Sequence, residues 1–290
     1  MKMKMKMKTF LSLTLVSMIF LTACKKVETQ FSPEPSRDEL LEKAWFYYDK
    51  GDFASAEFWF DSLITLNLQD REALLGKGYT LMERENYDLS SALSYFSLIL
   101  ALDGISLVEK RFKEVATIVQ GPSLPYGATW AIRTKKRNIV WVSSVIEAPA
   151  NVKIPFYFDD TLVYFKGSAP DTVTFIDYSY YVPQMGTDDK FLWAWAGIGF
   201  IYLAQDKNSL AAEYLYSLAK RSRAFYFPHY PFIKFTNIIG SAAYAYFKEG
   251  LFGNSVDVLK LSGWNDYPQD PFDPLSRLKI LLKIEELMND

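Results

Sequence analysis

A pattern of small and large apolar residues that recurs along the chain constrains its fold more than any other feature. In residues 37–70 the pattern has two halves separated by the turn Gly51-Asp52-Phe53, and its members are Ala44, Tyr47, Tyr48, Ala56, Phe60, Leu63 and Leu66. Spacings of three and four residues mark one face of an α-helix, and glycine is typical of the point where a helix ends. The segment therefore predicts two helices joined by a tight turn.

Related patterns occupy residues 71–104, 192–225 and 236–263. Repetition of a helix–turn–helix unit of about 34 residues resembles the tetratricopeptide repeat. Residues 37–70 match that register without a gap, although Lys43 stands where leucine is usual and Leu68 where proline usually ends the unit. The resemblance covers about half the chain and implies a stack of helical hairpins. A generic helical-hairpin protein is the alternative.

The fold class that we predict is mostly α, with tetratricopeptide-like helical hairpins in two blocks and an inserted small antiparallel β unit. Residues 106–119 suggest one more helix of the first block. The runs at 128–133, 138–147, 152–158, 162–166 and 172–181 are rich in Val, Ile, Trp, Tyr and Phe and are separated by turn residues, which is typical of strands. Some of these runs could instead be buried helix, because short apolar runs are ambiguous.

The predicted domains follow from these boundaries. Residues 1–23 form a signal peptide, residues 24–36 a lipidated cysteine with its tether, and residues 37–120 the N-terminal block. Residues 121–187 form the β-rich insertion, and residues 188–290 form the C-terminal block. Residues 274–288 read as one amphipathic helix with exposed charges, which suits the polar cap that helical-repeat proteins need.

The N-terminus has the three parts of a lipoprotein leader in order. Residues 1–8 alternate Met and Lys, residues 9–21 are largely apolar but too short to span a bilayer, and Leu21-Thr22-Ala23-Cys24 follows. The last four residues resemble the lipobox of bacterial lipoprotein precursors. The resemblance implies cleavage before Cys24 and a diacylglycerol on its sulfur. An ordinary signal peptide with a chance cysteine is the alternative.

A lipid on Cys24 would anchor the mature chain, since each buried methylene contributes about 0.8 kcal/mol. Lys25 follows the cysteine, and by resemblance the outer membrane is favoured over the inner one where the cell has both. Residues 25–36 are polar, contain two prolines and reach at most roughly 40 Å when extended. Apart from this covalent lipid we predict no cofactor.

Charge and composition exclude several classes of protein. Removing the four lysines of residues 1–23 changes the net charge from −2 to −6, which argues against a nucleic-acid partner. The single cysteine and single histidine exclude zinc sites built from those residues and disulfides within one chain. A metal site built entirely from oxygen ligands is the alternative that these counts leave open, and we predict no metal site.

The chain carries no recognisable catalytic constellation, and we predict that it is not an enzyme. His229 lies in the proline-rich and aromatic segment 226–231, which predicts a rigid loop between the third and fourth hairpins, and a general base would need a partner that the sequence does not reveal. Asp159-Asp160 reads as a hairpin turn, and Asp188-Asp189 reads as the N-cap of a helix.

The candidate binding surface is the inner face of the repeats. In the tetratricopeptide family, ligands are contacted mainly from fixed positions on the first helix of each hairpin. Carried over by register, these are Leu41, Trp45, Tyr48, Asp49, Leu75, Tyr79, Met82, Glu83, Trp193, Ala196, Phe200, Asn237, Tyr244 and Lys248. Trp and Tyr dominate binding hot spots, but the same residues at helical spacing are often core.

Two functions are consistent with these features. The first is a membrane-anchored scaffold of the cell envelope that binds a partner protein or peptide through the groove of the helical repeats. The second is a surface lipoprotein that binds glycans for nutrient capture, with aromatic rings as sugar platforms. The sequence does not determine the oligomeric state.

Overall fold

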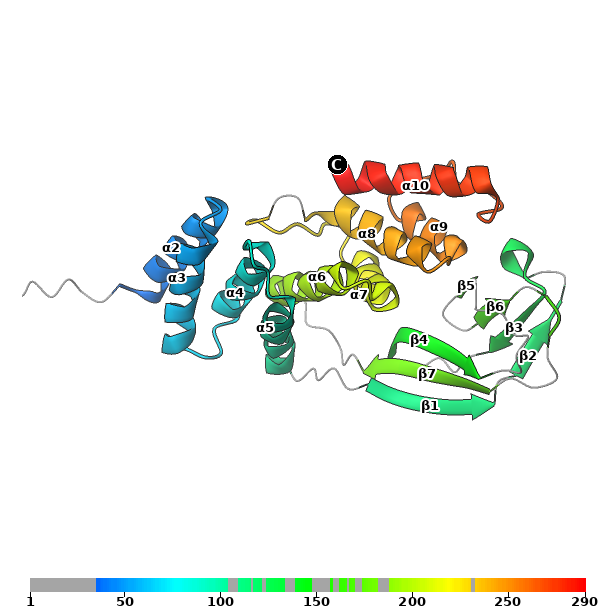
Figure 1. Ribbon diagram of the computed structural model, residues 1–290, viewed down its shortest axis with the longest axis horizontal. Helices are drawn as coiled ribbons and strands as arrows, with labels where there is room; N and C mark the ends of the chain where they lie inside the picture. The colour runs from blue at the N-terminus through cyan, green and yellow to red at the C-terminus, as the bar shows by residue number, and fades with distance from the viewer. Residues whose placement is uncertain are drawn as a thin grey trace, which may run out of the picture. The chain divides into compact units, whose positions relative to one another are not determined.

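The computed structural model describes residues 35–103, 109–115, 117–121, 124–133, 139–147, 157–158, 162–165, 167–169, 174–181, 188–230 and 233–290. Contacts divide the chain into Met1–Ser36 and Arg37–Asp290, and the second unit contains all of the described helices and strands. This unit is mostly helical, with an antiparallel β unit inserted between two blocks of helical hairpins, as predicted (Figure 1).

Among the described residues, four helical hairpins and a final helix form the helical part. Their helices are α2 (Arg37–Asp49) with α3 (Phe53–Leu66), α4 (Arg71–Glu83) with α5 (Leu89–Leu102), α6 (Asp189–Ala204) with α7 (Asn208–Arg221), α8 (Phe235–Lys248) with α9 (Phe252–Lys260), and α10 (Pro274–Asn289). Each helix packs against the next along the chain, from α2 to α9. Within the described residues, none of the helices has the length and hydropathy of a membrane span.

Local sequence explains where these helices begin and end. Gly51 closes the first turn with φ of +74°, a backbone conformation that glycine adopts without a steric cost. The next residue, Asp52, caps α3 because its carboxylate accepts the Ser55 amide N–H at 3.1 Å. Asp70, Asp88, Asp188 and Asp273 cap α4, α5, α6 and α10 in the same way. The predicted N-cap at residue 188 is therefore confirmed.

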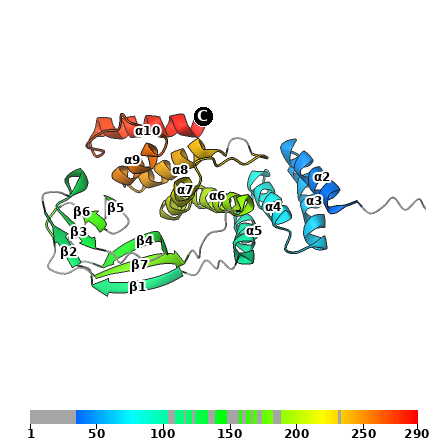
Figure 2. The same ribbon diagram turned by 180° about the vertical axis from the view of Figure 1, so that it is seen from behind.

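The two helical blocks pack directly on each other although the β unit separates them in sequence. The Phe96 ring of α5 lies against Gly78 of α4 and Gly197 of α6, where an added Cβ would come within 2.5 Å and 2.4 Å of the ring. Arg71 of α4 forms ion pairs with Asp103, which ends α5, and with Asp188, which begins α6. Helices α5 and α6 therefore meet as successive members of one stack, with the β unit looped out between them (Figure 2).

The described strands of the β unit form two antiparallel sheets. The first has the order β1 (Glu109–Val115), β7 (Thr174–Tyr181) and β4 (Ile139–Glu147), with β7 in the centre. The second has the order β2 (Thr117–Gln120), β3 (Trp130–Arg133), β6 (Leu162–Phe165) and β5 (Tyr157–Phe158). Strand β4 packs on α7 and strand β5 on α9, so the unit rests on the helices as its modest size requires.

The predicted helix at residues 106–119 is wrong, because strands β1 and β2 occupy the described residues of this segment. The segment 109–114 reads Glu-Lys-Arg-Phe-Lys-Glu, residues that favour helix on intrinsic propensity. Instead, Glu109 to Val115 pairs in register with Tyr180 to Thr174. Strand pairing far along the chain overrides the local preference, so the β unit begins at Glu109 and the first helical block ends with α5. The predicted turn at Asp159-Asp160 lies outside the described residues.

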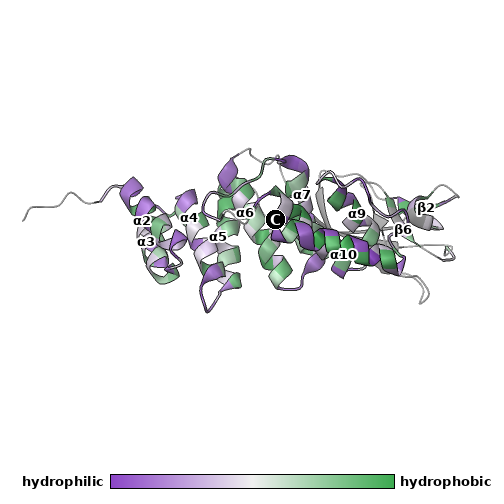
Figure 3. Cartoon of the chain, turned by 90° about the horizontal axis from the view of Figure 1, so that it is seen from above, coloured by the Kyte–Doolittle hydropathy of each residue, from purple (hydrophilic) through white to green (hydrophobic). Residues whose placement is uncertain are grey.

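The final helix matches the predicted segment closely and packs on α8 and α9. Its buried side carries Ile280, Ile284 and Leu287. Its other side is less polar than predicted, because Leu275, Leu278 and Leu282 are more than half exposed among the lysines and glutamates. Figure 3 shows this mixture of hydrophobic and hydrophilic residues along α10.

Candidate partner-binding site

The surface that the repeat register predicts is covered by a segment of the chain itself. We call residues 225–235 the strap, of which 231 and 232 lie outside the described residues. The strap folds back on itself between α7 and α8, with the Phe227 N–H donating to the Ile233 carbonyl at 3.3 Å and the Phe235 N–H donating to the Phe225 carbonyl at 3.1 Å. The segment around His229, predicted as a rigid loop, therefore reverses the direction of the chain between α7 and α8.

Phe227 of the strap joins the first helices of three hairpins. Its ring centroid lies 6.0 Å from that of Trp45 on α2, 4.6 Å from Tyr79 on α4 and 5.1 Å from Trp193 on α6. The ring is completely buried. The register thus correctly brings these three aromatic residues to one surface, but a side chain of the same molecule fills the space between them.

Other bonds fasten the strap along this surface. The Trp193 indole N–H donates to the Tyr226 carbonyl at 2.9 Å and ties the strap to α6. The Tyr79 hydroxyl donates to the Trp193 carbonyl at 2.8 Å, which joins α4 to α6. The side chains of Tyr230 and Glu83 are hydrogen-bonded to each other. Burial raises the pKa of Glu83, and this hydrogen bond works against the rise. The strap is therefore held by polar groups as well as by apolar packing.

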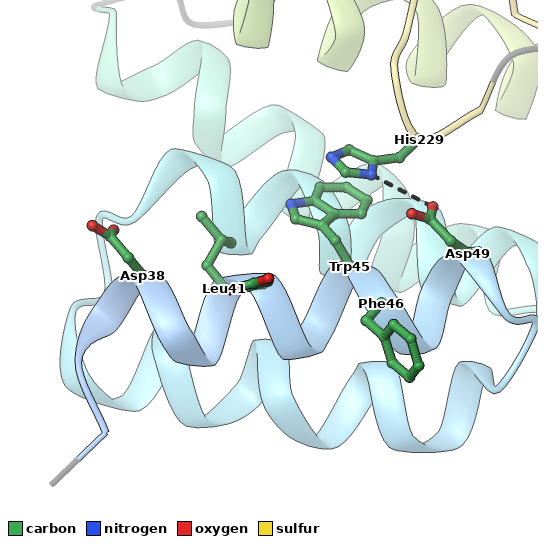
Figure 4. Close-up of a pocket in the computed structure, with 7 residues that line it drawn as sticks. Asp38, Leu41, Trp45, Phe46, Asp49 and His229 are labelled. Atoms are coloured by element: carbon green, nitrogen blue, oxygen red, sulfur yellow. Dashed lines mark ion pairs between the residues drawn. The ribbon is translucent and has the colours of Figure 1, made fainter.

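His229 completes the strap over the first hairpin. Its imidazole stacks on the Trp45 indole with ring centroids 3.8 Å apart and planes 4° apart. Its Nδ1 lies 3.5 Å from the Asp49 carboxylate, which is the partner that the sequence does not reveal (Figure 4). Burial lowers the pKa of His229, and the charge of Asp49 opposes this shift. The histidine therefore belongs to a contact between the strap and α2.

Beside this contact, α2 and the strap enclose an open hollow of about 430 Å³, which we call the α2 hollow. Its lining residues are Asp38, Leu41, Glu42, Trp45, Phe46, Asp49 and His229. All but His229 come from successive turns of α2, with acidic side chains alternating with aromatic and aliphatic ones (Figure 4). The volume lies in the range of ordinary ligand sites.

Acidic side chains determine the charge of the α2 hollow. Asp38 pairs with Arg37 at 3.1 Å, and Asp49 pairs with His229. Glu42 is exposed and forms no ion pair with any described residue. The buried indole N–H of Trp45 and the buried hydroxyl of Tyr48 also have no hydrogen-bond partner among the described residues. An unmade hydrogen bond at a buried donor costs about 1–3 kcal/mol, but both groups are buried behind the lining, so the hollow itself offers carboxylates.

The structure separates the predicted binding residues into three groups. Leu41, Trp45 and Asp49 line the α2 hollow. Leu75 and Tyr79 are completely buried and Tyr48 almost so, which places them in the core rather than on an open groove and corrects their predicted role. Met82, Glu83, Trp193, Phe200 and Tyr244 are half-buried around the strap or along the helical core. Asp38, Glu42, Phe46 and His229 were missed, although the acidic residues at helical spacing on α2 were a usable signal.

Comparisons with known proteins do not assign the chain to a family, because no family model matches it. No significant similarity to a curated protein or a solved structure is found either. Among the described residues, His, Cys, Asp and Glu side chains form no group of three or more that could hold a metal ion. The α2 hollow and the sequence are therefore the two grounds on which a function can be proposed.

Proposed function

We propose that the protein is a lipid-anchored scaffold of the cell envelope, and that the α2 hollow holds an extended segment of a partner protein that carries Lys or Arg. The observation that carries the proposal is exposed Glu42, which forms no ion pair with any described residue, in a hollow otherwise lined by acidic, aromatic and aliphatic side chains. A basic side chain of the partner would meet this carboxylate.

The spacing of the acidic lining residues supports this arrangement. Asp38, Glu42 and Asp49 lie four and seven residues apart, which places them along one side of α2. An extended peptide that lies along this helix presents side chains at short intervals, since its residues rise about 3.3 Å each.

The choice of a protein segment over a glycan follows from how Trp45 is packed. Sugar platforms expose the flat face of an aromatic ring, whereas the His229 imidazole covers one face of Trp45 and the relative exposure of Trp45 is only 5%. The hollow offers ring edges and carboxylates instead. Acidic surfaces of this kind select partners mainly through charge complementarity, which also speeds association.

The anchor in this proposal is the lipid on Cys24, and the proposed location is the outer membrane. Its support is the order of the basic segment, the apolar segment and the lipobox in the sequence. Residues 1–34 lie outside the described residues, so the length of the tether is its one property that the proposal uses. We propose tetratricopeptide-like repeats as the origin of the hairpins, because the predicted small residue Ala56 and the Gly51 turn fall where two helices meet.

The test is a binding titration with the soluble Cys24→Ser chain. Extended peptides that carry Lys or Arg are titrated by calorimetry, alongside matched peptides in which Gln replaces the basic residues. Wild type should bind the basic peptides, and Glu42→Gln should weaken this binding several-fold. Glu285→Gln is the matched control, because Glu285 is also an exposed, unpaired glutamate of a helix in the described structure. Equal affinity of the two variants for every peptide would count against the proposal.

A further inference from the structure

The first hairpin has one side that no described helix or strand covers. Helices α2 and α3 pack on each other and on α4. Glu57 and Asp61 mark the side of α3 that faces α4, since both form ion pairs of 2.7 Å with Lys77 of that helix. Trp59 and Leu66 lie about half a turn around α3 from these two acids and so face away from the stack.

Aromatic and aliphatic side chains gather on this outward side, which we call the outer face. Phe58 is 62% exposed and Leu66 is 69% exposed. Trp59 and Tyr47 are half-buried, and each is in edge contact with an exposed phenylalanine, Phe58 and Phe46 respectively. Large apolar side chains exposed together on one surface usually mark a place of interaction.

Lysines stand over two rings of the first hairpin, Trp59 on the outer face and Phe46, which also lines the α2 hollow. The Lys43 ammonium lies 5.0 Å from the Trp59 ring centre, and the Lys50 ammonium lies 5.7 Å from that of Phe46. Glu39 lies one turn before Lys43 on α2, so the net charge of the outer face is small. Trp and Tyr with lysine beside them are the combination found where proteins meet the interface of a membrane. The rings rather than the charge would therefore supply most of the affinity.

The length of the tether limits which surfaces the outer face can contact. Twelve residues separate Cys24 from α2, an extended length of at most roughly 40 Å. Among the helices, α2 directly follows this tether, so a lipid on Cys24 holds the first hairpin close to the bilayer. Tethering raises the effective concentration of the face at the membrane, and a weak contact then becomes significant.

We propose that the outer face of the first hairpin rests on the lipid surface, with Trp59, Tyr47 and Phe58 at headgroup level. This inference rests on the proposed anchor at Cys24. The membrane contact would turn the far side of the first hairpin and the rest of the stack toward the aqueous side. The alternative is that a second copy of the chain covers this face, and the experiment below distinguishes the two.

The experiment uses the mature chain, residues 24–290, coupled through Cys24 to a maleimide lipid. Cys24 is the single cysteine, so the coupling is specific. The vesicles are phosphatidylcholine and phosphatidylglycerol with bromine near the headgroup end of the acyl chains, which quenches tryptophan at the interface. Chemical coupling makes the result independent of whether cells lipidate Cys24, so this proposal and the proposed anchor can fail separately.

We expect quenching in the wild-type chain that is mostly lost in Trp59→Phe and retained in Trp264→Phe, a matched change of another half-buried tryptophan. Phe58→Ser combined with Leu66→Ser, which alters only exposed side chains, should also lose most of the quenching. Absent quenching in wild type, or equal quenching in the two Phe variants, would overturn the proposal. So would a dimer of the uncoupled chain, seen by sedimentation velocity, that Phe58→Ser dissociates.

Discussion

The His229 imidazole lies flat on the Trp45 indole, 3.8 Å away, and its Nδ1 faces Asp49 one helical turn further along α2. The two rings come from the first hairpin and from the strap before the fourth hairpin. This contact closes the strap over the inner side of the repeats. It also forms one wall of the α2 hollow, so strap and hollow are parts of one structure.

The first prediction concerns the pKa of His229. Because burial disfavours the imidazolium, the pKa of His229 should lie below 6.5, and Asp49→Asn should lower it further by removing the carboxylate that opposes this shift. Proton NMR measures this pKa directly, since the chain has one histidine. A wild-type pKa above 6.5, or a rise in the Asn variant, would contradict the described contact.

The lowered pKa of His229 also sets how stability depends on pH. A histidine whose pKa is lowered by folding contributes stability that is complete above the unfolded pKa, near 6.5, and is lost as the pH falls through the folded pKa. Wild type should therefore lose stability relative to His229→Phe as the pH falls from 7 toward 5. Urea denaturation at both pH values checks this.

The second prediction tests whether the strap belongs to the core. Phe227→Ala removes a completely buried ring from between three aromatic residues and should cost about 3–5 kcal/mol of unfolding free energy. Its neighbour Tyr226, whose side chain is 52% exposed, supplies the control, and Tyr226→Ala should cost far less. Urea denaturation compares the two. Similar small losses would show that the strap lies loosely on the helices.

The third prediction concerns the crossing of α2 and α3. Ala56 is completely buried, so Ala56→Trp must displace the neighbouring helix, at a cost of about 1–3 kcal/mol or more. Ala54, on the exposed side of the same helix, should accept tryptophan with little change. Thermal melting of the two variants decides the matter, and equal melting temperatures would contradict the described packing.

The fourth prediction concerns the anchor. Cys24→Ser should release the mature protein from the membrane, because the lipid on Cys24 is the proposed attachment. Partitioning into a detergent phase measures the release. If the Ser variant partitions like wild type, the lipoprotein proposal fails, whatever the vesicle experiment on the outer face shows.

Much of the helical architecture could be predicted because its causes are local. The apolar spacing, the Gly51 turn and the N-cap at Asp188 depend on residues close together in the sequence, and all of them lie where the sequence predicts them. The register also correctly aligned Trp45, Tyr79 and Trp193, which reach a common ring. Sequence spacing on neighbouring first helices is enough to place such residues side by side.

Features made by distant segments could not be predicted in this way. Strand β1 depends on pairing with β7, which overrides the helical preference of residues 109–114. The filled groove depends on Phe227, and nothing in the strap sequence states which surface it will cover. The α2 hollow exists because His229 arrives from the strap, so its lining could not be assembled from α2 alone.

The measurement that tests the central claim most directly is photocrosslinking in living cells from a probe amino acid at Leu41. The proposal predicts one dominant crosslinked partner, joined through a segment that carries Lys or Arg. Charge reversal by Glu42→Lys should abolish this crosslink, and Glu285→Lys should leave it intact. A crosslink that survives Glu42→Lys, or a partner segment without basic residues, would contradict the assignment of the α2 hollow as the binding site.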